Sequence, residues 1–138
     1  MQIRSFKLGD EATVVALWNE CGLTRSWNDP HKDIARKLEV QPELFLVGVV
    51  DEAVMASVMA GYEGHRGWMN YLAVTPRFRG RGYGRALVDH AERLLLERGC
   101  PKVNLQVRAS NPAAVAFYRR LGYAQDESIS LGKRLIVD

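Results

Sequence analysis

Glycine and arginine are concentrated in the segment from Arg77 to Arg85, which reads Arg-Phe-Arg-Gly-Arg-Gly-Tyr-Gly-Arg. Glycines at positions 80, 82 and 84 let the backbone turn so that successive N–H groups point at one anion. A helix that starts here adds partial positive charge, and Arg79, Arg81 and Arg85 would donate charged hydrogen bonds to phosphate oxygens. The segment therefore predicts a pyrophosphate-binding loop.

Two other phosphate-binding motifs do not fit this loop. A P-loop requires Gly-Lys followed by Ser or Thr, whereas the expected helix opens with Gly84, Arg85 and Ala86. A dinucleotide fingerprint requires a glycine in place of Arg85. It also requires a carboxylate near the end of the next strand, which reads Val-Asn-Leu-Gln-Val over 103–107. Both motifs are therefore absent, and the phosphate-containing ligand is not identified by either of them.

Hydrophobic periodicity predicts the elements that position the loop. Strands are expected at 2–6, 44–50, 54–62, 68–74 and 103–107, with a hairpin turn at 51–53. The loop follows the fourth of these strands. The helix after it is expected to end at Gly99 and to bury Leu87, Ala91, Leu94 and Leu95.

Three more helices have recognisable starts. Asp10 is expected to cap a helix whose apolar face is Val14, Leu17, Trp18 and Cys21. Asp29 and Pro30 begin a second helix, and a third runs from Asn111 and Pro112 to Gly122. The tail from Tyr123 to Ile136 is expected to add one or two strands. The order of elements predicts an α/β fold in which helices cover a mixed sheet.

Composition narrows the class of protein. The chain has 138 residues, 47% of them hydrophobic, and a net charge of +3, which describes one globular domain and excludes a disordered or collagen-like chain. Cys21 and Cys100 have no metal-ligand spacing, so no metal site is expected and a reducing cytoplasm fits best. The charged first seven residues do not resemble a signal peptide, and 44–50 is too short to cross a bilayer. A soluble protein is expected.

The loop sequence Arg79-Gly80-Arg81-Gly82-Tyr83-Gly84 matches the Arg/Gln-x-x-Gly-x-Gly/Ala motif of the GNAT superfamily of acetyl-CoA-dependent N-acetyltransferases in full. The chain resembles this family over almost its whole length, including the segment from Asn111 to Tyr123. The resemblance implies one N-acetyltransferase domain over 1–138. Its fold would be α/β, with a mixed, mostly antiparallel sheet of six to seven strands and about four helices. It also implies acetyl-CoA as cosubstrate, no metal, and direct attack by a primary amine in a ternary complex.

The resemblance further implies which residues bind acetyl-CoA. Leu72, Ala73 and Val74 would lie beside the pantetheine arm, and an N–H near Leu72 would polarise the thioester carbonyl. The phosphates would be bound by Arg79, Gly80, Arg81, Gly82, Tyr83, Gly84 and Arg85. Asn111 matches a residue that often contacts the cosubstrate, although capping of its helix explains it equally well.

Tyr118 matches the family's proton donor to the departing CoA thiolate, while a packed aromatic is the alternative. The base that deprotonates the amine stays unassigned. Many relatives have a carboxylate in the fourth strand, but this strand has none over 68–72. Glu63, His65 and a water chain are the candidates. The segment from Trp27 through Asn28 to Asp29 corresponds to part of the acceptor pocket in relatives, and a hydrophobic staple with a helix cap explains it as well.

Three classes of function follow in order of preference. The first is an enzyme that acetylates a primary amine on a small molecule, peptide or protein. The second is a module that binds acetyl-CoA without efficient transfer. A nucleic-acid binder ranks third, because 16 acidic residues nearly balance 19 basic ones. The sequence leaves the acceptor amine and the oligomeric state open, with a homodimer as one option, and indicates no membrane partner.

Overall fold

The computed structural model describes all 138 residues, which form two compact units, 1–105 and 106–138. The first unit contains β1 (Gln2–Ser5), α1 (Glu11–Glu20), α2 (Pro30–Leu38), β2 (Phe45–Val50), β3 (Ala53–Tyr62), β4 (Gly67–Val74), α3 (Tyr83–Glu97) and β5 (Val103–Leu105). It also has short 3-10 turns at η1 (Leu8–Asp10), η2 (Pro42–Leu44) and η3 (Pro76–Phe78). The second unit contains α4 (Pro112–Arg120) and an irregular tail. The expectation of a single domain stays a prediction.

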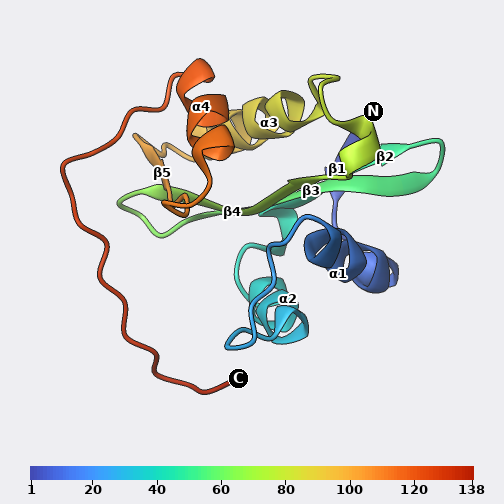
Figure 1. Cartoon of the computed structure of the whole chain (residues 1–138), viewed down its shortest axis with the longest axis horizontal. Coiled ribbons are helices and arrows are strands. Elements are labelled where there is room, and N and C mark those ends of the chain that lie inside the picture. The colour runs from blue at the N-terminus through green and yellow to red at the C-terminus, as the bar shows by residue number, and fades with distance from the viewer. The chain divides into compact units, whose positions relative to one another are not determined.

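The five strands form one sheet in chain order, β1-β2-β3-β4-β5. The first three pairs are antiparallel and the pair β4–β5 is parallel, so the sheet is mixed as predicted. The predicted hairpin joins β2 and β3 through Asp51 and Glu52, which have φ of 49° and 65°. Figure 1 shows α1 and α2 on one face of the sheet and α3 on the other.

Both faces of the sheet bury the predicted apolar helix faces. On the α1 side, Val14 and Trp18 are fully buried, and Trp18 stacks on Phe45 at 6.1 Å between ring centroids. Ile34 of α2 joins the same core cluster. On the α3 side, Leu87, Val88, Ala91 and Leu95 are fully buried, whereas Leu94, also predicted to be buried, is only half-buried. This packing fixes β3 and β4 between two helical layers.

The two acidic residues at helix starts behave differently. Asp29 caps α2 as predicted, because its carboxylate accepts a 2.9 Å hydrogen bond from the backbone N–H of His31. Asp10 precedes α1 but makes no cap bond to that helix, so this part of the prediction is wrong. Its carboxylate instead accepts from the Arg4 guanidinium at 2.8 and 3.0 Å and from the backbone N–H of Lys7. The bond from Arg4 lowers the pKa of Asp10 and ties β1 to η1.

The predicted strands of the tail do not form, and the expectation of six to seven strands is wrong, because the sheet has five. Leu131 and Val137 are 91% and 89% exposed. Strand-forming residues yield a strand only where their backbone groups find a partner edge, and sequence pattern alone does not supply one. For the same reason β5 ends at Leu105 instead of extending to residue 107.

Candidate active site

A β-bulge interrupts β4 two thirds of the way along the strand. Ser57 pairs with Ala73 and Met59 pairs with Asn70, so Val58 alone lies opposite both Tyr71 and Leu72. Tyr71 has φ of 54°, a left-handed conformation that is rare for an aromatic residue. Such conformations persist only where the surrounding structure enforces them, and they concentrate at functional sites.

Three contacts from other elements hold Tyr71 in this conformation. Its ring stacks on Trp18 of α1, with centroids 3.8 Å apart and planes 11° from parallel. Its carbonyl accepts a 3.0 Å hydrogen bond from the buried Ser57 hydroxyl, which itself accepts from Trp18 Nε1 at 2.9 Å. Its own hydroxyl donates to Asp33 Oδ2 of α2 at 2.6 Å. The bulge is therefore fixed by both helices on that face of the sheet.

The outer edge of β4 opens just at this bulge. β5 pairs with β4 only from Gly67 to Met69, so no strand pairs with the outer edge from Asn70 to Val74. Leu72 and Val74 are half-buried there, and Ala73 is buried. An unpaired edge with an extra residue leaves backbone groups available to an extended ligand, as in strand addition.

The predicted phosphate loop lies between η3 and α3. Gly80 and Gly82 have φ of 78° and 80°, and no protein atom lies within 4 Å of the position that a Cβ would take on either. Gly82 is the N-cap of α3 and offers no side-chain cap, and the first helical bond is Ala86 N–H to Gly82 C=O at 3.0 Å. The preceding N–H groups of the first turn are the ones that α-helices present to anions.

The arginines of the loop have different neighbours. Arg79 Nε donates to the carbonyl of Val74 at 3.3 Å, which links the loop to the open end of β4. The Arg81 guanidinium lies 4.8 Å from the centroid of the Phe78 ring. Arg85 forms an exposed 3.8 Å ion pair with Asp89 along α3. Exposed ion pairs contribute little, so the Arg85 side chain is available to a phosphate.

Glu63 and His65, the candidate bases, are exposed in the turn between β3 and β4. The Glu63 carboxylate accepts hydrogen bonds from the backbone N–H groups of Arg66 and His65, and these bonds lower its pKa. A carboxylate with a lowered pKa is a weaker base. These bonds are those of a residue that stabilises its turn, and they weaken the case for Glu63 as the base that deprotonates the amine.

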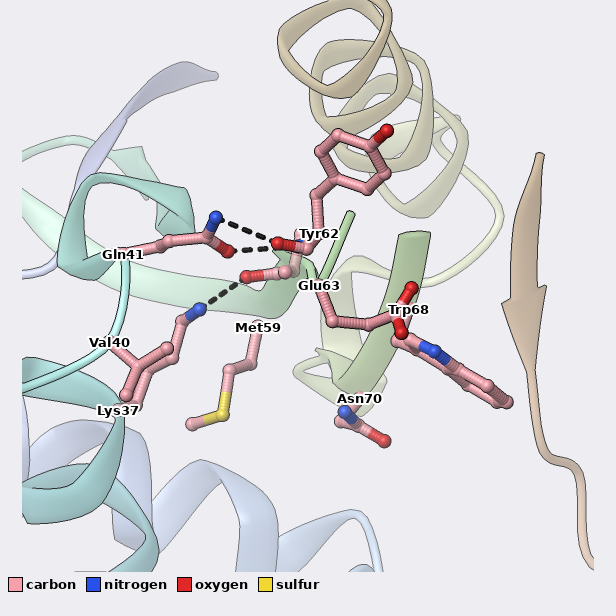
Figure 2. A pocket seen from close by; sticks show the side chains of 10 residues that line it. Lys37, Val40, Gln41, Met59, Tyr62, Glu63, Trp68 and Asn70 are labelled. Carbon is pink, nitrogen blue, oxygen red and sulfur yellow. Dashed lines mark hydrogen bonds between the residues drawn. The ribbon is translucent and has the colours of Figure 1, made fainter. Parts of the chain in front are cut away.

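A pocket of about 220 Å³ lies between the end of α2 and strands β3 and β4 (Figure 2). The residues that line it include Lys37, Val40, Met59, Glu63, Trp68 and Asn70. Asn70 immediately precedes the bulge, so the pocket adjoins the open part of β4. Trp68 is 37% exposed and is the second residue of β4, the strand that has no carboxylate over 68–72.

The segment before α2 is connected to the bulge through one carboxylate. Asn28 Nδ2 donates to Asp33 Oδ2 at 3.0 Å, the same oxygen that accepts from Tyr71. Trp27 is 57% exposed, so it is not a buried staple. The predicted acceptor segment therefore contacts α2 and, through Asp33, the bulge.

The second unit contains the two remaining predicted residues, Asn111 at the N-cap of α4 and Tyr118 within that helix. Asn111 Oδ1 accepts from the backbone N–H of Ala114 at 3.1 Å, which confirms its capping role. Tyr118 packs edge-on against Phe117 and Tyr123, at 5.1 and 5.7 Å between centroids. Burial raises the pKa of Tyr118 to about 12. The phenol is therefore protonated at neutral pH.

Sequence reasoning missed the residues that support the bulge and one that lines the pocket. Ser57 is a hydroxyl residue within an apolar strand, a signal that a buried polar group has a specific partner. Asp33 and Lys37 belong to an amphipathic helix, where charged residues ordinarily face solvent, and nothing local marks them.

No helix is long and apolar enough to cross a membrane, and no group of three His, Cys, Asp or Glu side chains is arranged to bind a metal ion.

Comparison with known proteins gives consistent results. The family model described as "Acetyltransferase (GNAT) family" matches residues 12–123. Acetyltransferase YE1169 of Yersinia enterocolitica is 52% identical over 138 residues, which cover 100% of this chain and 98% of that protein. The structure of Ard1 from Thermoplasma volcanium is 28% identical with a TM-score of 0.78, over 89% of this chain and 82% of that one. The PaiA N-acetyltransferase of Thermoplasma acidophilum, solved with coenzyme A, shares the fold at 18% identity, with a TM-score of 0.79 over 93% and 92% of the chains.

Proposed function

Because the chain belongs to the GNAT acetyltransferase family, we propose that it transfers the acetyl group of acetyl-CoA to a primary amine while both substrates are bound. The observation that carries this proposal is the open outer edge of β4, which adjoins an uncapped helix start through the Arg79 to Val74 hydrogen bond. An extended pantetheine arm and a pyrophosphate require these two features together. The coenzyme A complex of PaiA supports the choice of ligand.

The residues present fit acetyl-CoA. Backbone groups of Leu72, Ala73 and Val74 would pair with the amides of the pantetheine arm. Space is left around Gly80 and Gly82 where side chains would otherwise stand, so the backbone can approach a phosphate closely. The phosphate-binding set is Arg79, Gly80, Arg81, Gly82, Tyr83, Gly84 and Arg85. When bound, acetyl-CoA supplies an activated acyl group and a thiolate leaving group.

The bulge is proposed to stabilise the negative charge that develops on the thioester oxygen. The extra residue turns the backbone at Tyr71 and Leu72 away from the regular ladder, so the Leu72 N–H would donate to that oxygen. The contacts of Tyr71 with Trp18, Ser57 and Asp33 hold the donor in place before the substrate arrives. Such preorganisation is what makes a hydrogen bond effective in the transition state.

Proton transfers complete the reaction. The amine nitrogen bonds to the acyl carbon, the carbon–sulfur bond breaks, and the Tyr118 hydroxyl gives its proton to the thiolate. The Tyr118 hydroxyl is protonated at neutral pH, so the proton is present when the thiolate forms. The proton lost by the amine passes to water or to His65, because the Glu63 carboxylate is engaged in its turn and has a lowered pKa. Asn111 is proposed to cap α4 and so to position Tyr118 on that helix.

An assay of thiol release from acetyl-CoA across primary amines, amino acids, polyamines and peptides tests the proposal, with product mass measured for each amine. At least one amine is expected to gain an acetyl group with release of one CoA thiol. The alternative, a binding module, predicts thermal stabilisation by CoA without transfer to any amine. Absence of both stabilisation and transfer in folded protein would exclude acetyl-CoA as the ligand.

A further inference from the structure

The pocket beside Asn70 presents carbon surface from three elements. Its apolar walls are Val40 of the loop after α2, Met59 of β3 and Trp68 of β4 (Figure 2). Val40 and Trp68 are 62% and 37% exposed, so much of their carbon surface is open to solvent. A ligand that covers such surface gains binding free energy from removing it from water.

Gly61 keeps the pocket open next to Trp68. The two residues pair directly across β3 and β4, so a side chain at position 61 would pack beside the indole. A Cβ there would lie 3.5 Å from both Gln41 Oε1 and Lys37 Nζ, which is ordinary contact, and φ of Gly61 is not in the left-handed region. Neither the backbone nor crowding requires glycine at this position. A glycine inside a strand without a bulge often marks the close approach of a ligand.

The polar groups around the pocket are already bound within the protein. Gln41 uses both ends of its amide on the backbone of Tyr62, at 2.9 and 2.8 Å. The Lys37 ammonium donates to a carbonyl of β3 and interacts with the Glu43 carboxylate. The Glu63 carboxylate accepts two backbone N–H groups of its own turn. A polar group of a ligand would therefore lose its hydration here without gaining a new partner.

The pocket adjoins the proposed acyl site. Met59 pairs with Asn70, which immediately precedes Tyr71 at the bulge. Met59 belongs to the core on the α2 face of the sheet, and its pairing places Asn70 on that face. The phosphate loop leads into α3 on the opposite face (Figure 1). A group in the pocket therefore leaves the phosphate loop free, as binding of both substrates together requires.

We propose that the acceptor is a primary amine with an uncharged hydrocarbon group, aliphatic or aromatic, and that this group binds against Trp68 and Met59 in the space above Gly61. An apolar cavity of about 150 Å³ holds benzene. The pocket of about 220 Å³ thus has room for a phenyl or a branched aliphatic group. Amines that place a charge or hydroxyl group there, such as polyamines and aminoglycosides, are disfavoured. This inference rests on the proposed acetyltransferase function and names the substrate class of the same site.

Three amines that differ only in their last group test the preference. Wild-type protein is assayed with acetyl-CoA and pentylamine, 4-aminobutan-1-ol or butane-1,4-diamine. The kcat/KM for pentylamine should exceed that for the other two by about 10- to 100-fold, because the hydroxyl and the second ammonium lose water without compensation. A kcat/KM for the diamine equal to or above that for pentylamine would overturn the proposal and assign the indole face to a cation.

A binding measurement separates this proposal from the proposed function. In CoA-bound, isotope-labelled wild type, pentylamine should shift the NMR signals of the Gly61 backbone N–H and the Trp68 indole N–H. The alcohol and the diamine should leave these signals in place at the same concentration. Such shifts without acetyl transfer to any amine would mean that the proposed function fails while the pocket assignment holds. Equal shifts with all three amines, or none with any, would overturn the proposal.

Variants locate the effect at the pocket. Gly61→Ala should lower the ratio of kcat/KM for 3-phenylpropylamine to that for ethylamine by at least about tenfold, because the added methyl fills space that only the larger amine uses. Trp68→Ala should lower the same ratio, and Trp68→Phe should retain part of it. The matched control is Gly9→Ala, since Gly9 of η1 also has open space and no left-handed φ, and it should not change the ratio. A wild-type ratio in folded Gly61→Ala and Trp68→Ala proteins would overturn the proposal.

Discussion

The hydroxyl of Tyr71 donates a 2.6 Å hydrogen bond to Asp33 Oδ2, and this bond joins the bulge of β4 to α2. Asn28 donates to the same oxygen, so one carboxylate connects the segment before α2 with the backbone beside the open strand edge. The connection makes α2 a support for the proposed oxyanion donor at Leu72. If the bulge positions this donor, a change to the bond should lower the rate of acetyl transfer. That effect can be measured separately from any change in the free energy of unfolding.

Tyr71→Phe removes this hydrogen bond and keeps the stack on Trp18. We expect kcat to fall about tenfold while KM for acetyl-CoA changes less than about twofold, because a misplaced Leu72 N–H weakens only the transition state. Asp33→Asn retains an acceptor oxygen and should have a smaller effect. Steady-state kinetics checks both. An unchanged kcat in Tyr71→Phe would mean that the bond only stabilises the fold.

Ser57→Ala removes two hydrogen bonds, the buried one from Trp18 Nε1 to the Ser57 hydroxyl and the one from that hydroxyl to the carbonyl of Tyr71. The expected loss is about 1–3 kcal/mol in the free energy of unfolding, measured by urea denaturation. Ser5→Ala is the control, because Ser5 donates to the Glu43 carbonyl from an exposed position and should change stability by less than about 1 kcal/mol. Similar losses in both variants would contradict the role given to Ser57.

Gly82→Val tests the phosphate loop. A branched side chain at φ of 80° is strained and blocks the approach of a phosphate, so CoA affinity should fall by at least about tenfold. Gly99→Val is a matched control, since Gly99 has φ of 81° with open space around it but lies past the end of α3. It should lose stability without loss of CoA affinity in calorimetry. Equal affinities for the two folded variants would contradict the loop assignment.

Tyr118→Phe separates proton donation from packing. If the hydroxyl protonates the thiolate, kcat should fall by about 10²- to 10⁴-fold with acetyl-CoA affinity and stability nearly intact. Tyr118→Ala should lose turnover and also stability, because the ring packs against Phe117 and Tyr123. Wild-type turnover in a folded Tyr118→Phe protein would leave Tyr118 as a packing residue.

The raised pKa of Tyr118 also predicts a pH dependence of stability. Its pKa of about 12 in the folded state lies above the ordinary value of 10.0, so the folded state binds the proton more tightly. The contribution is complete below about pH 10 and is lost as the pH rises toward 12. Thermal unfolding should therefore show a steeper alkaline loss in wild type than in Tyr118→Phe. Parallel curves would contradict the assigned shift.

The loop, most helix starts and the core faces could be predicted because their signals are local. Gly80 and Gly82 adopt the positive φ that their sequence suggests, and Asp29 with Pro30 begins α2. The conformation of Tyr71 could not be predicted, because its local preference opposes it and contacts with Trp18, Ser57 and Asp33 override that preference. Lys37 became visible as a pocket residue only once β3 and α2 were in place. In the tail the pattern of residues predicts a strand, but no strand forms because no partner strand pairs with it.

Transfer of an isotopically heavy acetyl group tests the central claim most directly. Wild-type protein and the Gly82→Val variant are each incubated with heavy acetyl-CoA and the best amine of the panel, and the amine is analysed by mass spectrometry. Wild type should produce the heavy acetylated amine in step with free CoA, and the variant should produce much less at the same acetyl-CoA concentration. Release of CoA without a labelled amine, or no release at all from protein that binds CoA, would contradict the assignment as an N-acetyltransferase.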